Sequence, residues 1–559
     1  MAKRTGPVFP ALHLRRLREI TTVLVKYGFP DVVSRLRLER TVAMGRRLRL
    51  RGRPRPWGTR AQRLRLALEE LGPTFIKFGQ ALSTRADLLP AELVAELSRL
   101  QDQVPPLPPG VAVAAVEAEL GEPIAVVFRE FDPEPVAAAS IAQVHRAVLS
   151  SGEEVAVKVR RPGIETNIER DLAIMAQLAR LADRYLPDAD LYHLTELVSE
   201  FARSIRRELD LSLEGRTIER FARNFAADSS VKFPRVYRHR TTRGLLTLEY
   251  IHGTKVLEIL PAKEGLDPAL VARRGADLML RQVLEHGLFH ADPHPANIFV
   301  LPGNVICLLD LGNVGRLDRA MRTALAALVE GIVREDPERM ARALMAIGRP
   351  LRPVDHRQLT RDLGELLDAY SGVTFSDLQV GPLLQEAVTV MRRYRLQFPP
   401  DLMLLVRAFV TIEGVGRQLD PSFALIEQAR PVVMAILAER LRPAALAARA
   451  GEVGREMAEA IQALPRDLLE IVDKAKDDRL QIQFVHRGLE HFVQEMDRSS
   501  NRLSFAIVIA ALIVGSSFVL QRGTGPMIFG LPAVGLVGFI AAGVLGLWLA
   551  VGILRSGRL

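Results

Sequence analysis

His290-Ala-Asp292-Pro-His-Pro-Ala-Asn297, followed by Val305-Ile-Cys-Leu-Leu-Asp310-Leu-Gly312, is the part of the sequence that decides the fold. Asn297 comes five positions after Asp292, and Asp310 ends an apolar run thirteen positions after Asn297. In kinase-type phosphoryl-transfer sites, the first Asp orients the attacking hydroxyl or accepts its proton, and the Asn and second Asp hold metal ions on the ATP phosphates. The spacing therefore predicts a catalytic Asp292, metal ligands at Asn297 and Asp310, and ATP and Mg²⁺ as cofactors.

The histidines of this stretch admit another interpretation. His290 and His294 are four apart, and a helical H-x-x-x-H pair is a known zinc motif. Pro293 and Pro295 disfavour a helix here, and the sequence offers no third ligand at the usual spacing. We therefore expect an irregular loop that His290 braces.

A lysine earlier in the chain completes the pattern. Val155-Ala-Val-Lys158 reads as a strand with a central lysine, like the lysine that binds the α- and β-phosphates of ATP in kinases. Lysines on edge strands are common, so the strand alone would not establish this role. The strand precedes the Asp292–Asp310 series, as the lysine strand of a kinase would, and this order indicates a phosphate-binding role. We predict that Lys158 is both ATP-binding and catalytic.

Such a lysine needs a carboxylate partner, and the long helical region 164–222 offers three. These are Glu208, Asp210 and Glu214, of which the last two are four apart and would share a helix face. We favour Glu214 as the ion-pair partner.

The loop before Lys158 departs from the usual glycine-rich form. Its backbone N–H groups remain available to phosphates, but each Cβ stiffens the loop and limits close approach. The predicted ATP-binding residues of this segment are Ala137, Ala138, Ala139, Ser140 and Gln143.

The segment after Asp310 is short. A helix is predicted directly after it, with Asp318 as N-cap, so little chain remains to dock a peptide substrate. Ala291 also replaces the Arg that protein kinases usually place before the catalytic Asp. Small-molecule or lipid chemistry is therefore favoured over protein phosphorylation.

The charge distribution and the cysteine content indicate which partners and which redox compartment the protein has. Residues 1–65 hold 18 Lys/Arg and 3 Asp/Glu, a net +15 in a chain of net +10. This arm could lie on an anionic membrane or pack as a solvated helix; nucleic acid is disfavoured, since no recognised binding motif accompanies the charge. The single cysteine, Cys307, fits a buried small side chain and a reducing compartment.

The C-terminal region is apolar. Leu503–Leu520 and Phe529–Leu554 approach or exceed the roughly 20 residues of a membrane-spanning helix. Arginines outside the pair predict that both ends, and the catalytic domain, face the cytoplasm of a bacterial-type inner membrane. The alternative is a buried hairpin of a soluble core. The N-terminus lacks the long apolar core of a signal peptide.

Together these motifs resemble the UbiB/AarF family of atypical kinases over most of the chain. The stretches that carry the resemblance are Lys77-Phe-Gly79-Gln80, Ala137–His145, Val155–Lys158, Glu208-Leu-Asp210, His290–Asn297 and Asp310-Leu-Gly312. The resemblance implies that Lys77, Gln80, Glu208 and Asp210 form a lid of ion pairs and hydrogen bonds over the site where a protein substrate would bind. It also implies ATPase activity linked to lipid binding, in ubiquinone or related prenyl-lipid metabolism. Leu311 stands where the family usually has Phe, and this apolar replacement should change packing more than chemistry.

The expected fold class is α+β: a protein-kinase-like two-lobe fold with a helical N-terminal extension and a C-terminal transmembrane helix hairpin. The expected divisions are a basic arm (1–66), the Lys-x-Gly-Gln extension (67–105), an N-lobe with a helical insert (106–255), a C-lobe (256–430), a juxtamembrane region (431–500) and transmembrane helices at 503–520 and 529–554.

Three functions stay open at this stage. The favoured one is a membrane-anchored ATPase or small-molecule kinase that serves isoprenoid-quinone synthesis and acts on a membrane lipid or prenyl-quinone intermediate. The others are a genuine protein kinase and a nucleotide-sensing scaffold for other quinone-biosynthesis enzymes. The sequence does not distinguish ubiquinone from menaquinone, or a homodimer from other oligomeric states.

Overall fold

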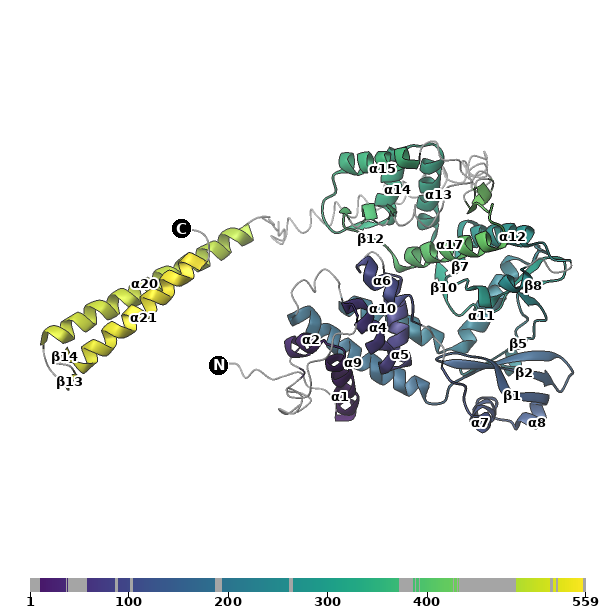
Figure 1. Ribbon diagram of the computed structural model, residues 1–559, viewed down its shortest axis with the longest axis horizontal. Coiled ribbons are helices and arrows are strands. Elements are labelled where there is room, and N and C mark those ends of the chain that lie inside the picture. Colours follow the sequence, from purple (N-terminus) through teal and green to yellow (C-terminus); the bar gives the residue numbers. More distant parts are fainter. Residues whose placement is uncertain are drawn as a thin grey trace, which may run out of the picture. The chain divides into compact units, whose positions relative to one another are not determined.

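The structure is a computed structural model of the chain. The chain divides into two compact units, Met1–Leu446 and Ala447–Leu559. All of the predicted site residues lie in the first (Figure 1). The described residues are 11–36, 38, 58–85, 89–100, 104–185, 194–260, 265–370, 386–387, 389–391, 393–425, 427–429, 431, 489–522, 526–528 and 531–555.

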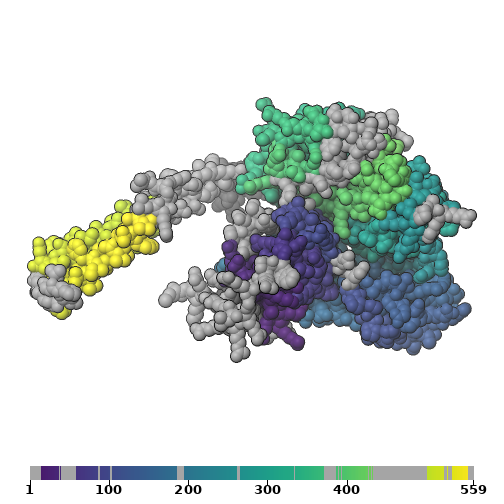
Figure 2. Space-filling model, in the orientation of Figure 1, coloured from purple at the N-terminus to yellow at the C-terminus, as the bar shows by residue number. Residues whose placement is uncertain are grey.

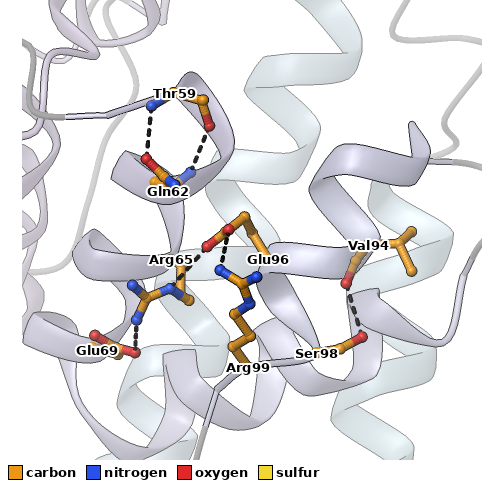
Figure 3. Close-up of polar contacts among 8 residues, drawn as sticks. All are labelled: Thr59, Gln62, Arg65, Glu69, Val94, Glu96, Ser98 and Arg99. Atoms are coloured by element: carbon orange, nitrogen blue, oxygen red, sulfur yellow. Dashed lines mark hydrogen bonds and ion pairs between the residues drawn. The ribbon is translucent and has the colours of Figure 1, made fainter.

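The first helices form the N-terminal extension. Thr59 and Gln62 make a reciprocal capping box at the start of α4, and Arg65 bonds Glu69 and the buried Glu96, which ties α4 to α6 (Figure 3). Gly72, with φ 93°, ends α4 and separates it from α5. The extension contains α1 (Ala11–Lys26), α2 (Pro30–Arg35), α4 (Arg60–Leu71), α5 (Pro73–Ser83) and α6 (Ala91–Leu97).

The first sheet carries Lys158. Its strands are antiparallel in the order β1-β2-β3-β5, and the strand predicted around Lys158 is β3. On β3 the valines 155, 157 and 159 are buried, and Lys158 points to the opposite face because side chains alternate along a strand. The elements here are α7 (Pro109–Leu120), α8 (Ile124–Val127), β1 (Phe128–Ala138), β2 (Ala142–Leu149), β3 (Glu154–Arg160), η3 (Arg238–Arg240) and β5 (Leu245–Glu249).

Three helices connect β3 to the second sheet: α9 (Ile164–Tyr185), α10 (Leu194–Glu208) and α11 (Leu211–Asn224). The sequence predicted one helical region with Asp210 on the same helix face as Glu214, and this was wrong. Asp210 precedes α11 as its N-cap, where its carboxylate accepts the Ser212 N–H at 3.1 Å. Glu208 ends α10, and only Glu214 lies within α11.

The second sheet, with strand order β4-β9-β8-β6, and the separate two-stranded sheet β10-β7 hold the predicted catalytic stretch. Strand β7 pairs with β10, with His290 opposite Val314, so the stretch from Ala291 to Asn313 is closed at its base. The short strand Val231–Lys232 pairs with β9 in parallel. The strands are β4 (Val231–Lys232), β6 (Thr254–Lys255), β7 (Leu288–His290), β8 (Ile298–Leu301), β9 (Val305–Leu308) and β10 (Val314–Arg316), with 3-10 turns η4 (Val256–Ile259) and η6 (Pro295–Asn297).

Helices pack around this sheet in one large hydrophobic core. Asp318 caps α13 by accepting the Met321 N–H at 2.7 Å, as predicted. Figure 2 shows the N-terminal helices in purple, the first sheet in blue, and the later helices in green. The later elements are α12 (Pro268–Arg281), the π-helical turn η5 (Gln282–His286), α13 (Arg319–Val333), α14 (Pro337–Ile347), β11 (Arg349–Pro350), α15 (His356–Tyr370), β12 (Leu396–Gln397) and α17 (Pro400–Leu419).

The second unit contains two long helices that pack along each other (Figure 1). They are α20 (Leu489–Arg522) and α21 (Ala533–Arg555), joined through the short strands β13 (Met527–Ile528) and β14 (Leu531–Pro532). Each has an apolar stretch long enough to cross a membrane, 500–521 and 533–551, and most of these side chains are exposed. The glycines 535 and 538 face Ser516, which allows close helix contact. The second predicted apolar segment began at Phe529, which lies outside the described residues, whereas the helix begins at Ala533.

Candidate active site

Three elements distant in sequence bring Lys158, Glu214 and Asp310 together. The Lys158 ammonium on β3 donates to both Glu214 oxygens, at 2.8 and 2.9 Å, and lies 3.6 Å from Asp310 Oδ2. The Glu214 side chain is only 6% exposed, whereas that of Asp310 is 45% exposed. One ammonium therefore faces a buried carboxylate on one side and a half-exposed carboxylate on the other.

Local structure explains the position of Glu214. Because Asp210 starts α11, Glu214 falls in the first turn of the helix. A Cβ on the next residue, Gly215, would lie 3.1 Å from Leu246 Cδ1 on β5, so glycine allows this turn to approach the first sheet closely. Lys158 is paired with Leu246 across β3 and β5. The same contact thus brings the carboxylate to the lysine.

The three charged groups shift one another's pKa values. Burial opposes the charge on Lys158, but the carboxylates of Asp310 and Glu214 outweigh it and raise the pKa of the amine. Lys158 is the main cause that lowers the pKa of Asp310, and Lys77 adds to the effect. Burial raises the pKa of Glu214 to about 7, against the opposing influence of Lys158. Shifted carboxyls in one small cluster are typical of functional sites.

The Asp-Leu-Gly turn is held from within. Asp310 Oδ1 accepts the Gly312 N–H at 2.9 Å, which orients the carboxylate. Leu311 is fully buried in the core of the second sheet, so its replacement of Phe affects packing and leaves the polar groups in place. The turn therefore presents Asp310 toward Lys158 from a fixed backbone.

The predicted catalytic loop, Ala291–Asn297, lies between β7 and β8. His290 is buried, donates its backbone N–H to Gln282 Oε1 at 2.9 Å, and has Nδ1 3.3 Å from the Asn313 carbonyl oxygen. Burial lowers the pKa of His290, which suits a neutral brace. The Asn297 carbonyl accepts the Leu309 N–H at 3.1 Å, which ties the loop to the residue before Asp310.

Asp292 has a partner that sequence reasoning missed. Arg407 Nη2, on α17, donates to Asp292 Oδ1 at 3.3 Å. No local pattern predicts this pair, because the two residues are 115 positions apart.

The alanine-rich segment is only partly a loop. Ala137 and Ala138 belong to β1 and pair with β2, while the Ala139 carbonyl accepts the Arg161 Nε–H at 2.9 Å. Ser140 is buried, and its Oγ has no hydrogen-bond partner among the described residues. The Gln143 amide is fully buried between the Leu107 N–H at 2.9 Å and His145 Nε2 at 2.7 Å. A direct contact of Gln143 with ATP would require these bonds to break, so its ATP-binding role stays a prediction.

The predicted lid residues separate into different contacts. Lys77 on α5 pairs with Glu208 at the end of α10 at 2.5 Å, and Gln80 Nε2 donates to the Leu100 carbonyl at 3.1 Å. Asp210 instead caps α11 and lies 3.3 Å from Arg243. The structure thus brings Lys77 and Glu208 together, whereas Gln80 and Asp210 each have other partners.

Two of the predicted site residues, Asn297 and Asp310, are the predicted metal ligands. In the part of the chain that the structure describes, no three His, Cys, Asp or Glu side chains are arranged to hold a metal ion. Asn297 and Asp310 offer one amide and one carboxylate, the hard oxygen ligands that Mg²⁺ accepts alongside substrate phosphates. Any roles of Asp292, Asn297 and Asp310 in metal binding or catalysis stay predictions.

Comparisons with known proteins agree on the family. The sequence model of the ABC1 atypical kinase-like domain matches residues 99–344, that of the UbiB helical domain matches 363–424, and that of the ABC1/UbiB kinase-like C-terminal domain matches 487–555. The expected kinase-like mixture of helices and sheets and the two apolar C-terminal helices are thereby confirmed.

Relatives match over most of the chain. A probable protein kinase UbiB from Pseudomonas fluorescens is 37% identical over 78% of this chain and 83% of its own length. An uncharacterized protein from the hydrogenase 1 5′ region of Clostridium pasteurianum is 31% identical over 97% and 99%. The solved Rv3197–erythromycin complex from Mycobacterium tuberculosis is 25% identical over 64% of this chain and 93% of that chain, with a TM-score of 0.46. The family models and the two sequence relatives confirm the predicted family: this chain belongs to the UbiB/AarF (ABC1) family of atypical kinases.

Proposed function

We propose that this protein is a membrane-anchored ATP-dependent phosphotransferase or ATPase that supports ubiquinone or related isoprenoid-quinone biosynthesis. The observation that carries the proposal is the Lys158 ammonium held between Glu214 and Asp310. In kinases such a lysine grips the α- and β-phosphates and pairs with a helix glutamate, while the Asp of the Asp-x-Gly turn binds the metal. The two sheets would then form the two lobes of a kinase-like fold.

The residues present fit Mg-ATP. With all three groups ionised, the Lys158 cluster carries a net charge of −1 and its exposed member is a carboxylate, a suitable ligand for a divalent cation. Asn297 and Asp310 would hold Mg²⁺, which would neutralise charge on the phosphates. The oxygen of the attacking hydroxyl or water would form a bond to the γ-phosphorus while the bond between that phosphorus and ADP breaks. Asp292 would accept the proton that the attacking oxygen loses.

A membrane setting is part of the proposal. The stretches 500–521 and 533–551 have mean hydropathies of 2.5 and 2.3 and are largely exposed in the second unit, as lipid-facing helices would be. We propose that they form a transmembrane hairpin with the catalytic domain in the cytoplasm, near a prenyl-lipid substrate.

Protein phosphorylation is less well supported. Only the residues 313–317 separate Gly312 from the Asp318 cap of α13, which leaves little chain for peptide docking. The Lys77–Glu208 pair also lies close enough to act on the charges of Asp310 and Lys158. A lid in this place would restrict a protein substrate.

The test is ATP hydrolysis by the full chain in vesicles that contain anionic lipid. The wild type should hydrolyse ATP only with Mg²⁺, and Asp310→Asn should abolish turnover. Equal hydrolysis by the variant would refute the metal assignment. Quinone profiles of a deletion strain complemented with wild type or Asp292→Asn would separate catalysis from scaffolding, since a scaffold would tolerate the substitution.

A further inference from the structure

Helix α17 lies against both strand β10 and the predicted catalytic loop. Asp401 Oδ1, near its start, accepts the Arg316 N–H at 3.0 Å. Arg407 Nη2 donates to Asp292 Oδ1 at 3.3 Å. Farther along, Ile412 lines a small cavity together with His290 and Pro293 of the catalytic loop. The contacts on either side of Arg407 hold this part of α17 beside β10 and the loop, while the Arg407 and Asp292 side chains themselves are 42% and 40% exposed.

The catalytic loop has no positive charge of its own. The sequence between Arg281 and Arg316 contains neither Lys nor Arg. Phosphoryl transfer depends on fixed positive groups and on accurate positioning of the group that orients the attacking hydroxyl. Lys158 supplies a cation from the first sheet. On the side of Asp292, the structure places Arg407.

We propose that Arg407 is a positioning residue for Asp292. Its guanidinium holds one carboxylate oxygen, so that the carboxylate keeps the orientation in which it receives the proton of the attacking group. Arg407 lies within the UbiB helical domain match, so the activity of the site depends on the packing of that domain against the loop. The inference rests on the proposed function, because Asp292 needs orientation only if it takes part in phosphoryl transfer.

The test compares three variants of the full chain in vesicles that contain anionic lipid. Arg407→Gln should lower kcat for ATP hydrolysis about 10- to 100-fold while KM for ATP changes less than about twofold, because orientation is lost and nucleotide binding is kept. Arg407→Lys should retain an intermediate kcat. Arg393→Gln is the matched control: Arg393 lies in the same helical domain match, its side chain is 63% exposed, and its guanidinium pairs with Asp362 at 2.6 Å and not with Asp292, so the substitution should leave both constants unchanged.

A double-mutant cycle separates positioning from a general loss of structure. In an Asp292→Asn background, adding Arg407→Gln should cause no further loss of kcat, because the oriented carboxylate is already absent. An unchanged or raised kcat in Arg407→Gln, a change confined to KM, or a full multiplicative loss in the double variant would overturn the inference. If Asp310→Asn abolishes hydrolysis while Arg407→Gln matches the wild type, the inference alone fails; if the wild type does not hydrolyse ATP, the proposed function fails with it.

Discussion

Two lysine–glutamate pairs take their glutamates from either side of the break between α10 and α11. The surroundings of the two pairs differ. Lys158–Glu214 joins a strand to the first turn of a helix, and its glutamate is 6% exposed. Lys77–Glu208 joins two helices of the N-terminal part, and its glutamate is 30% exposed. Only Lys158 also faces Asp310, at 3.6 Å. The same two residue types thus form a charge cluster suited to phosphates in one place and a link between helices in the other.

The largest difference should appear when each lysine is removed. Lys158→Met leaves Glu214 and Asp310 without their shared counter-ion. We expect ATP turnover to fall about 10²- to 10³-fold and the free energy of unfolding to fall by about 3–5 kcal/mol. Steady-state hydrolysis and urea unfolding measure the two effects. A loss of less than tenfold in turnover would contradict the assignment of Lys158 to the ATP site.

The buried glutamate predicts a pH dependence. Because the pKa of Glu214 is raised to about 7 from its usual 4.5, the folded state holds this proton more tightly than the unfolded state. Its contribution to stability is complete below about pH 4.5 and is lost as pH rises through 7. The stability of wild type relative to Glu214→Gln should therefore fall between pH 5 and 8, by at most about 3 kcal/mol. Urea unfolding at several pH values measures it, and a relative stability that rises with pH would contradict the assignment.

The lid pair should matter less. Lys77→Met removes one partly exposed ion pair, so we expect a loss of about 1 kcal/mol in stability and less than a tenfold change in ATP turnover. If the pair blocks a protein substrate, the variant should also gain phosphate transfer to an added protein. Lys26→Met is the matched control, since Lys26 pairs with Glu70 in the same extension and is 59% exposed. A turnover loss as large as that of Lys158→Met would erase the distinction between the two pairs.

The smallest expected effect is at Cys307. Burial raises the pKa of this thiol to about 12, so alkylation at pH 8 should be negligible in folded protein and equally slow in wild type and Lys77→Met. Mass spectrometry after a short iodoacetamide pulse measures it. Fast labelling of a variant would reveal that β9, which leads to Asp310, has opened and that its lost activity reflects unfolding.

Local patterns predicted the parts of the site that lie within one element. Alternating valines around Lys158 and the apolar run before Asp310 each identify a strand, because burial of one or both strand faces leaves a direct trace in sequence. The Asp318 cap was predicted because an N-cap side chain bonds the backbone N–H groups of the helix that starts directly after it.

Features that depend on tertiary structure could not be predicted in this way. Asp210 looked like a helix residue because the break after α10 has no Gly or Pro to mark it, and an Asp is a good N-cap as well. The burial of Gln143 depends on the Leu107 backbone, which comes from a proline-rich linker. The Arg407–Asp292 pair joins residues 115 positions apart and has no spacing rule.

The most direct test of the central claim is covalent labelling by an acyl-phosphate ATP probe, which transfers its acyl group to a lysine beside the bound phosphates. With Mg²⁺ and the full chain in vesicles, mass spectrometry should find the acyl group on Lys158, and excess ATP should block it. Asp310→Asn should reduce the labelling, and Lys77 should stay unmodified. Labelling at other lysines with Lys158 untouched, or labelling of Lys158 that ATP does not block, would contradict the account.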